Sequence, residues 1–177
     1  MLWLFTDAVR LPDPRSAVAR LPKGLCGVVL RHDSAPDRAR LGRDLARICR
    51  NRRLALVVAG DVRLAATLGA GVHLRAGLMP TGIGRIARRR GVFVTSSAHD
   101  LRQLHRATRA RADLAFLSPA FPTASHPNAI CLGAGGWIRL ARQAKLPVAA
   151  LGGIGSGSVR ALSRRGCRGA GAIGALV

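Results

Sequence analysis

Arginine and glycine stand at points of the chain where they could hold a phosphate group. Arg31 directly follows an apolar run, and its planar guanidinium can bind phosphate through two parallel hydrogen bonds. Gly152 and Gly153 follow another run and open a segment rich in glycine and serine. Glycines let the backbone approach a phosphate, and the N-terminus of a following helix points free N–H groups at the anion. The sequence therefore predicts a phosphate-binding site, with a plain strand-to-helix turn as the alternative for the two glycines.

Two acidic residues near the same points offer a metal ligand and an ion-pair partner. Asp61 could hold a magnesium ion, which usually takes one or two carboxylates together with phosphate oxygens of the substrate. Alternatively, Asp61 caps a helix that begins at Val62, and the sequence leans slightly towards this role. Asp33 could pair with Arg31 at the rim of the site, and this ion pair is the alternative to a phosphate-binding role for Arg31.

The histidines differ in what they could do as acid or base groups. His73 lies inside an apolar run, where a hydrogen-bonded core histidine is the more common finding. His99 stands at the start of an expected helix, where it could simply be part of the cap. The strongest candidate is His126, because it lies in a proline-bounded loop with Thr123 and Ser125. The sequence alone assigns no catalytic residue.

A regular alternation of strands and helices would position these residues. The expected strands are eight short apolar runs: Leu2–Thr6, Gly27–Leu30, Leu54–Val58, Gly71–Leu74, Val92–Thr95, Leu114–Leu117, Val148–Leu151 and Ala172–Leu176. Such runs are typical of strands buried on both faces, as in a parallel sheet. Amphipathic helices lie between them, most clearly over Pro36–Arg50. Eight such units favour a closed (β/α)8 TIM-type barrel, in which reactive groups lie on the loops that follow the strands.

The chain is shorter than a complete barrel of this type. Eight full units usually need at least ~200 residues, whereas this chain has 177. It also ends at Val177, directly after the last expected strand. We therefore expect one short barrel domain over residues 1–177 whose last helix is missing. The outer face of the last strand would then be left partly bare or be covered by a partner subunit, as in a homodimer.

The charge balance is strongly basic, with 29 lysines and arginines, 8 acidic residues and a formal net charge of +21. A basic excess can mark a partner rich in phosphate. Here the arginines are spread along the chain, and aromatic residues, on which single-strand binders stack bases, make up only 3%. The composition therefore disfavours specific nucleic-acid binding, and small phosphorylated substrates are the expected partners.

Other features of the composition exclude further classes of protein. The four cysteines show neither metal-site spacing nor a disulfide framework, so we expect small buried side chains. No apolar run approaches the ~20 residues of a membrane span, and the apolar N-terminus lacks the basic start and the length of a signal peptide. We expect a cytoplasmic protein without membrane association.

Six short segments, spread in order along nearly the whole chain, carry a resemblance to a known family. They are Leu2–Asp7, Val57–Asp61, Gly69–Leu74, Ser97–His99, Phe121–Thr123 and Pro147–Ile154, the last being the strongest match. By their order and spacing the chain resembles the thiamine phosphate synthase family and its relative, the thiazole tautomerase. The resemblance implies a transferase of thiamine biosynthesis that joins an aminopyrimidine diphosphate to a thiazole phosphate, with magnesium as cofactor and with loss of pyrophosphate.

The resemblance also implies roles for individual residues. Arg31 would contact the diphosphate, Ser97 would touch a diphosphate oxygen, and Asp61 would bind the metal. The backbone at Gly152 and Gly153 would cradle the thiazole phosphate. The substrate-binding residues of the proline-bounded loop would be Thr123, Ser125 and His126.

The chain departs from the family pattern at several polar and charged positions. Val29 and Asp33 stand where the family has a glutamine and a lysine, and Leu78 stands at the second metal-binding aspartate. The other changed positions are Gly60 for an asparagine, Arg75 for a glycine, His126 for a lysine and Pro119 for the catalytic histidine of the tautomerase. These changes leave an alternative function open. The chain would then be a degenerate or re-purposed family member that binds a phosphorylated ligand or a protein partner without turnover.

Overall fold

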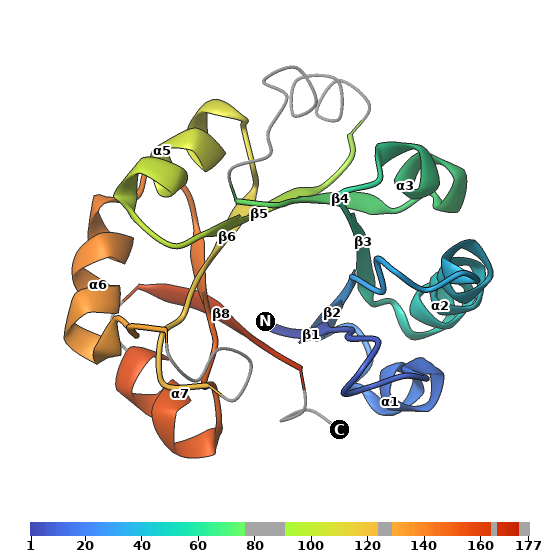
Figure 1. Ribbon diagram of the computed structural model, residues 1–177, viewed down its shortest axis with the longest axis horizontal. Helices are drawn as coiled ribbons and strands as arrows, with labels where there is room; N and C mark the ends of the chain where they lie inside the picture. The colour runs from blue at the N-terminus through green and yellow to red at the C-terminus, as the bar shows by residue number, and fades with distance from the viewer. Residues whose placement is uncertain (77–90, 124–128, 164–165, 174–177) are drawn as a thin grey trace.

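Parallel strands close into a barrel in the computed structural model, which describes residues 1–76, 91–123, 129–163 and 166–173. Each strand pairs with its neighbours in the chain, and the last pairs with the first (Figure 1). The strands are β1 (Leu2–Phe5), β2 (Cys26–Leu30), β3 (Ala55–Ala59), β4 (Gly71–Leu74), β5 (Val94–Ala98), β6 (Leu114–Leu117), β7 (Val148–Leu151) and β8 (Cys167–Ala172). The predicted (β/α)8 barrel is confirmed.

Helices surround the barrel, with α1 to α3 on one side and α5 to α7 on the other (Figure 1). Those in the described residues are α1 (Arg15–Arg20), α2 (Arg38–Arg52), α3 (Val62–Leu68), α5 (Leu101–Arg109), α6 (Gly133–Gln143) and α7 (Ser156–Ser163). Helix α2 buries one apolar stripe, which includes Leu41 and Leu45, as its periodicity predicts. Helices α3 and α5 each begin at an aspartate whose side chain accepts a backbone N–H three residues on.

The last strand lies earlier in the chain than we predicted. Its expected span was Ala172–Leu176, whereas β8 covers Cys167–Ala172. An apolar pattern cannot mark this strand, because glycines occupy positions where larger side chains would collide with the interior. An ideal Cβ at Gly171 would lie 2.8 Å from the ring of Phe5. Residues 174–177 lie outside the described residues, so the missing last helix stays a prediction.

Aromatic side chains from β1 and β6 fill the interior of the barrel. Trp3 and Phe5 alternate inward on β1, and both rings meet Phe116 edge-on, with centroids 5.5 and 4.8 Å apart. The neighbouring strand makes room for them, since an ideal Cβ at Gly27 would lie 2.4 Å from the Trp3 ring. Large side chains on one strand and glycine on the next therefore give the dense packing that a barrel interior needs.

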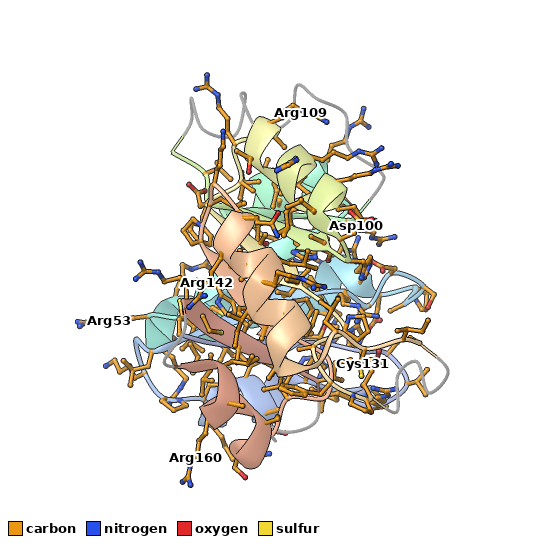
Figure 2. The ribbon with its side chains drawn as sticks, turned by 90° about the vertical axis from the view of Figure 1, so that its left-hand side faces the viewer. Arg53, Asp100, Arg109, Cys131, Arg142 and Arg160 are labelled. Carbon is orange, nitrogen blue, oxygen red and sulfur yellow. The ribbon has the colours of Figure 1, made fainter. Side chains whose placement is uncertain are left out.

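Four of the basic residues lie on the outer surface in separate places. Arg53, Arg109, Arg142 and Arg160 are exposed and extend from the ends or outer sides of four different helices (Figure 2). Charges spread over separate helices in this way are typical of solvent-exposed helix faces. None of the helices in the described part of the chain has the length and apolarity that crossing a membrane requires.

Candidate functional site

A cavity of about 860 Å³ opens at the carboxyl ends of the strands. Its floor is the last inward-facing layer of the barrel, which includes Phe5, Ala59 and Leu151. Five of the residues predicted to contact a substrate or a phosphate line it together: Arg31, Ser97, Thr123, Gly152 and Gly153. The cavity lies where a (β/α)8 barrel carries its reactive groups, and its volume suits a small-molecule ligand.

The segment after β7 lies tightly against the segment after β6. Gly152 and Gly153 both have positive φ, at 86° and 63°. The carbonyl of Gly152 accepts the N–H of Phe121 at 3.1 Å, and an ideal Cβ at Gly153 would lie 2.4 Å from the carbonyl oxygen of Pro122. Only glycine fits this backbone path. They place main chain, without side chains, at the wall of the cavity beside the start of α7.

Arg31 lies on the opposite side of the cavity, directly after β2. Its backbone N–H donates to the hydroxyl of Thr6 at 2.9 Å, which fixes the chain at this point. Its guanidinium is 3.7 Å from the carboxylate of Asp7, so its ion-pair partner is Asp7 and not the Asp33 that the sequence offered. Burial acts to raise the pKa of Asp7, but backbone N–H groups and Arg31 outweigh it and hold that pKa below its usual value.

Two further arginines and Asp33 form an ion-pair cluster beside β2, β3 and β4. The carboxylate of Asp33 is shared by the guanidinium of Arg38, at 3.3 Å, and by that of Arg75. Arg38 also donates to the carbonyl of Ala59 at 2.6 Å, and its side chain is only 15% exposed. Arg75 and Asp33 line the cavity. No sequence motif gives Arg75 a role, although its place directly after β4 could have marked it.

Asp61 is engaged in structural contacts. One carboxylate oxygen accepts the N–H of Leu64 at 2.9 Å and so caps α3, and the other lies 3.6 Å from Arg38. The residue does not line the cavity. Leu78, at the second ligand position, lies outside the described residues, and leucine has no donor atom. Of the two carboxylates in the family's pattern only Asp61 is therefore left, and contacts with Leu64 and Arg38 engage both of its oxygens, so this donor set does not fit a magnesium ion.

His73 and Ser97 are linked inside the barrel. The two ring nitrogens of His73 lie 2.8 Å from the hydroxyls of Thr95 and Ser97, as expected for a satisfied core histidine. Ser97 lies within β5 and not in the loop after it, because polar Thr95 and Ser97 face inward and find their partner in His73. Burial lowers the pKa of His73 to about 3, and the charges of Arg31 and Arg75 act in the same direction.

The neutral state of His73 predicts a loss of stability in mild acid. Below pH 6.5 the unfolded chain binds a proton at this histidine, whereas the folded chain does not until about pH 3, so the free energy of unfolding falls across that window. Between pH 6.5 and about pH 4.5, above the range of most carboxylates, the loss should be about 2 kcal/mol. Urea denaturation at several pH values measures it. The matched variant His73→Gln should show a flatter profile, and parallel profiles would contradict the assignment.

His99 and Thr123 also line the cavity. The Nδ1 atom of His99 donates to the carbonyl of Ser118 at 2.9 Å, so the neutral ring carries its lone pair on Nε2. The sequence could only offer this residue as part of a cap. Thr123 lines the cavity as predicted. Ser125 and His126 lie outside the described residues, so their predicted roles stay predictions.

A comparison with known families matches residues 7–176 to the family described as thiamine monophosphate synthase. The chain belongs to this family. The resemblance that the sequence motifs carry is thereby confirmed. Its fold agrees as well. The thiamine phosphate pyrophosphorylase of Pyrococcus furiosus superposes with a TM-score of 0.79 over 97% of this chain and 84% of that structure, at 24% identity.

Curated relatives have a higher sequence identity to this chain than that structure has, and some of them are considerably longer than this chain. The thiamine-phosphate synthase of Parasynechococcus marenigrum is 33% identical over 160 residues, which are 89% of this chain and 46% of the relative. That of Geobacillus thermodenitrificans is 31% identical over 79% of this chain and 64% of its own length. The P. furiosus enzyme is 27% identical over 99% of this chain and 86% of its length. The chain thus spans between about half and most of the length of these relatives.

Proposed function

We propose that the chain is a thiamine phosphate synthase-like transferase, which joins an aminopyrimidine diphosphate to a thiazole phosphate in thiamine biosynthesis. One observation carries the proposal: a cavity of about 860 Å³ has a guanidinium on one side and a glycine-lined backbone on the other. Two anionic groups at opposite ends of a pair of small substrates suit this arrangement. Family membership supports the same reaction.

The proposed reaction breaks the bond between the pyrimidine methylene carbon and the diphosphate oxygen. Both electrons of that bond leave on pyrophosphate, and the thiazole nitrogen supplies the pair for the new carbon–nitrogen bond. The protein's task is to hold both substrates and to stabilise the charge on the leaving group. Arg31 and Ser97 would face the diphosphate. Gly152 and Gly153 would hold the thiazole phosphate, with Thr123 beside it.

One observation favours the alternative function. Asp61 is engaged as a helix cap and with Arg38, and the described residues do not fit a magnesium ion. A family member that binds its phosphorylated ligand without turnover would not need a magnesium site. Substrate binding that leaves both substrates unchanged would identify that function.

A cytoplasmic location and a homodimer that covers the outer face of β8 are part of the same proposal. Small phosphorylated metabolites are handled in the cytoplasm, and the homodimer carries over the sequence-based expectation for the last strand. Sedimentation analysis of the purified protein measures the oligomeric state. A monomer at all concentrations would overturn the homodimer without touching the proposed reaction.

A turnover assay tests the transferase directly. Purified protein is mixed with the aminopyrimidine diphosphate, the thiazole phosphate and magnesium, and thiamine phosphate is detected by oxidation to a fluorescent product. We expect product above a blank, and a loss of about tenfold or more in kcat/KM for Arg31→Ala, because a charge-assisted contact to the leaving group is removed. Arg53→Ala changes the charge equally at an exposed position and should retain full activity. Absence of product from folded protein that binds both substrates would overturn the transferase.

A further inference from the structure

We propose that this site binds the diphosphate group through the guanidinium groups of Arg31 and Arg75, without a divalent cation. The inference rests on the proposed function for the identity of the ligand. It concerns the side of the cavity where β2, β3 and β4 end, which is the side opposite the two glycines.

Arg75 occupies a space that a side chain at position 60 would fill. An ideal Cβ at Gly60 would lie 3.1 Å from Nε of Arg75 and 3.2 Å from its Cζ. Gly60 also has φ of +70°, a conformation that disfavours other residues. The guanidinium therefore lies over bare main chain after β3, and from there it lines the cavity. Glycine at this position makes the entry of Arg75 possible.

Arg75 is held by a shared and half-exposed carboxylate. Asp33 contacts both Arg38 and Arg75, while Asp61 lies near Arg38 alone, so the carboxylate that holds Arg75 is shared with a second guanidinium. Arg38 is the more fixed of the two, since it also donates to Ala59 and lies near Asp61. Arg75 is 42% exposed, and its contact with Asp33 engages one of its three nitrogens. Two nitrogens of the Arg75 guanidinium therefore lie outside the contact with Asp33, and this side chain lines the cavity.

Arg31 supplies the second cation. Its guanidinium lies 3.7 Å from Asp7, which is too long for a hydrogen bond, and it is 41% exposed. A long ion pair whose guanidinium is open to solvent stabilises the protein little, so an incoming anion can take the place of Asp7. Both arginines line the same cavity and both act on His73. Guanidinium forks bind phosphate oxygens in pairs, which suits two neighbouring phosphoryl groups.

The carboxylate that a metal ion would need, that of Asp61, is engaged in other contacts. Asp61 caps α3, pairs with Arg38 and stays out of the cavity. Among the described residues the charged side chains that line the cavity are three arginines and one aspartate: Arg10, Arg31, Arg75 and Asp33. An anion entering here meets guanidinium groups directly, and no divalent cation is needed to bridge it to the protein.

Calorimetric titration with inorganic pyrophosphate tests the inference, once in excess EDTA and once in excess magnesium. We expect binding in EDTA. Arg75→Ala should weaken it by about tenfold, the equivalent of one charge-assisted hydrogen bond. Arg53→Ala, which removes the same charge from an exposed position away from the cavity, should stay within about twofold. Equal weakening by both variants would show a nonspecific charge effect and overturn the inference.

Substitutions of Asp33 and Asp61 distinguish pyrophosphate binding by arginines from binding through a metal ion, and Asp44 provides the control. Asp33→Asn releases Arg75 and should tighten pyrophosphate binding in EDTA, whereas Asp44→Asn, the same charge change on the outer helix α2, should not. Asp61→Asn keeps the helix cap and should leave binding unchanged. Binding that requires magnesium and is lost in Asp61→Asn would overturn the inference.

The outcome separates this inference from the proposed function. Pyrophosphate binding in EDTA without any coupling activity would support the arginine site and overturn the transferase. Coupling activity together with no pyrophosphate binding in EDTA would support the transferase and overturn the arginine site.

Discussion

The Gly153→Ala variant is expected to bind thiazole phosphate about a hundredfold more weakly and to lose about 2 kcal/mol of stability. Gly153 has φ of +63°, where an L-residue costs about 1–2 kcal/mol. Its new Cβ would lie 2.4 Å from the carbonyl oxygen of Pro122 and 2.7 Å from the backbone of Phe121. Because these neighbours are main chain, the loop must move as a whole, and the N–H groups that would face the phosphate move with it.

The matched control lies in the same loop. Gly155 has no atom within 4 Å of an ideal Cβ, and its φ is not in the positive region. Gly155→Ala should keep wild-type stability to within about 0.5 kcal/mol and wild-type affinity to within about twofold. Calorimetric titration with thiazole phosphate and urea denaturation measure both quantities. If the two variants bind equally well, the backbone at Gly153 is not the phosphate cradle.

Much of this architecture follows from local sequence. A strand buried on both faces must be apolar throughout, so runs such as Leu114–Leu117 mark the barrel strands directly. Once the strands are known, the loops after them must meet at one end of the barrel. Arg31, Gly152 and Gly153 could therefore be placed in one site although more than a hundred residues separate them in the chain.

The details that local sequence cannot provide depend on side chains from distant strands. β5 continues through Ser97 because His73, on the neighbouring strand, satisfies its polar groups. The partner of Arg31 is Asp7, from the loop after the strand on its other side. Arg75 enters the site because position 60 is glycine. In each case the deciding contact joins residues that are at least 15 positions apart, and no periodic pattern records it.

Trp137→Ala is expected to lower the free energy of unfolding by about 3–5 kcal/mol, the usual loss for truncating a large buried aromatic side chain. Trp137 is fully buried between α6 and the barrel, and its indole N–H donates to the carbonyl of Leu117 at 3.1 Å. Leu117 is the last residue of β6, directly before the loop that packs on Gly152 and Gly153. The substitution leaves a cavity and removes a hydrogen bond at the base of the site. Urea denaturation followed by circular dichroism measures the change.

Trp137→Phe separates packing from hydrogen bonding. Phenylalanine keeps most of the buried ring but lacks the N–H, so it should cost about 1–2 kcal/mol, mainly from the carbonyl of Leu117 that loses its partner. Equal midpoints for the two variants would show that the hydrogen bond, and not the packed ring, is decisive. Since domains of this size have only about 5–15 kcal/mol of stability, the alanine variant should also populate unfolded protein near physiological temperature. The loops proposed to bind phosphate would then depend on the packing of α6 against the barrel.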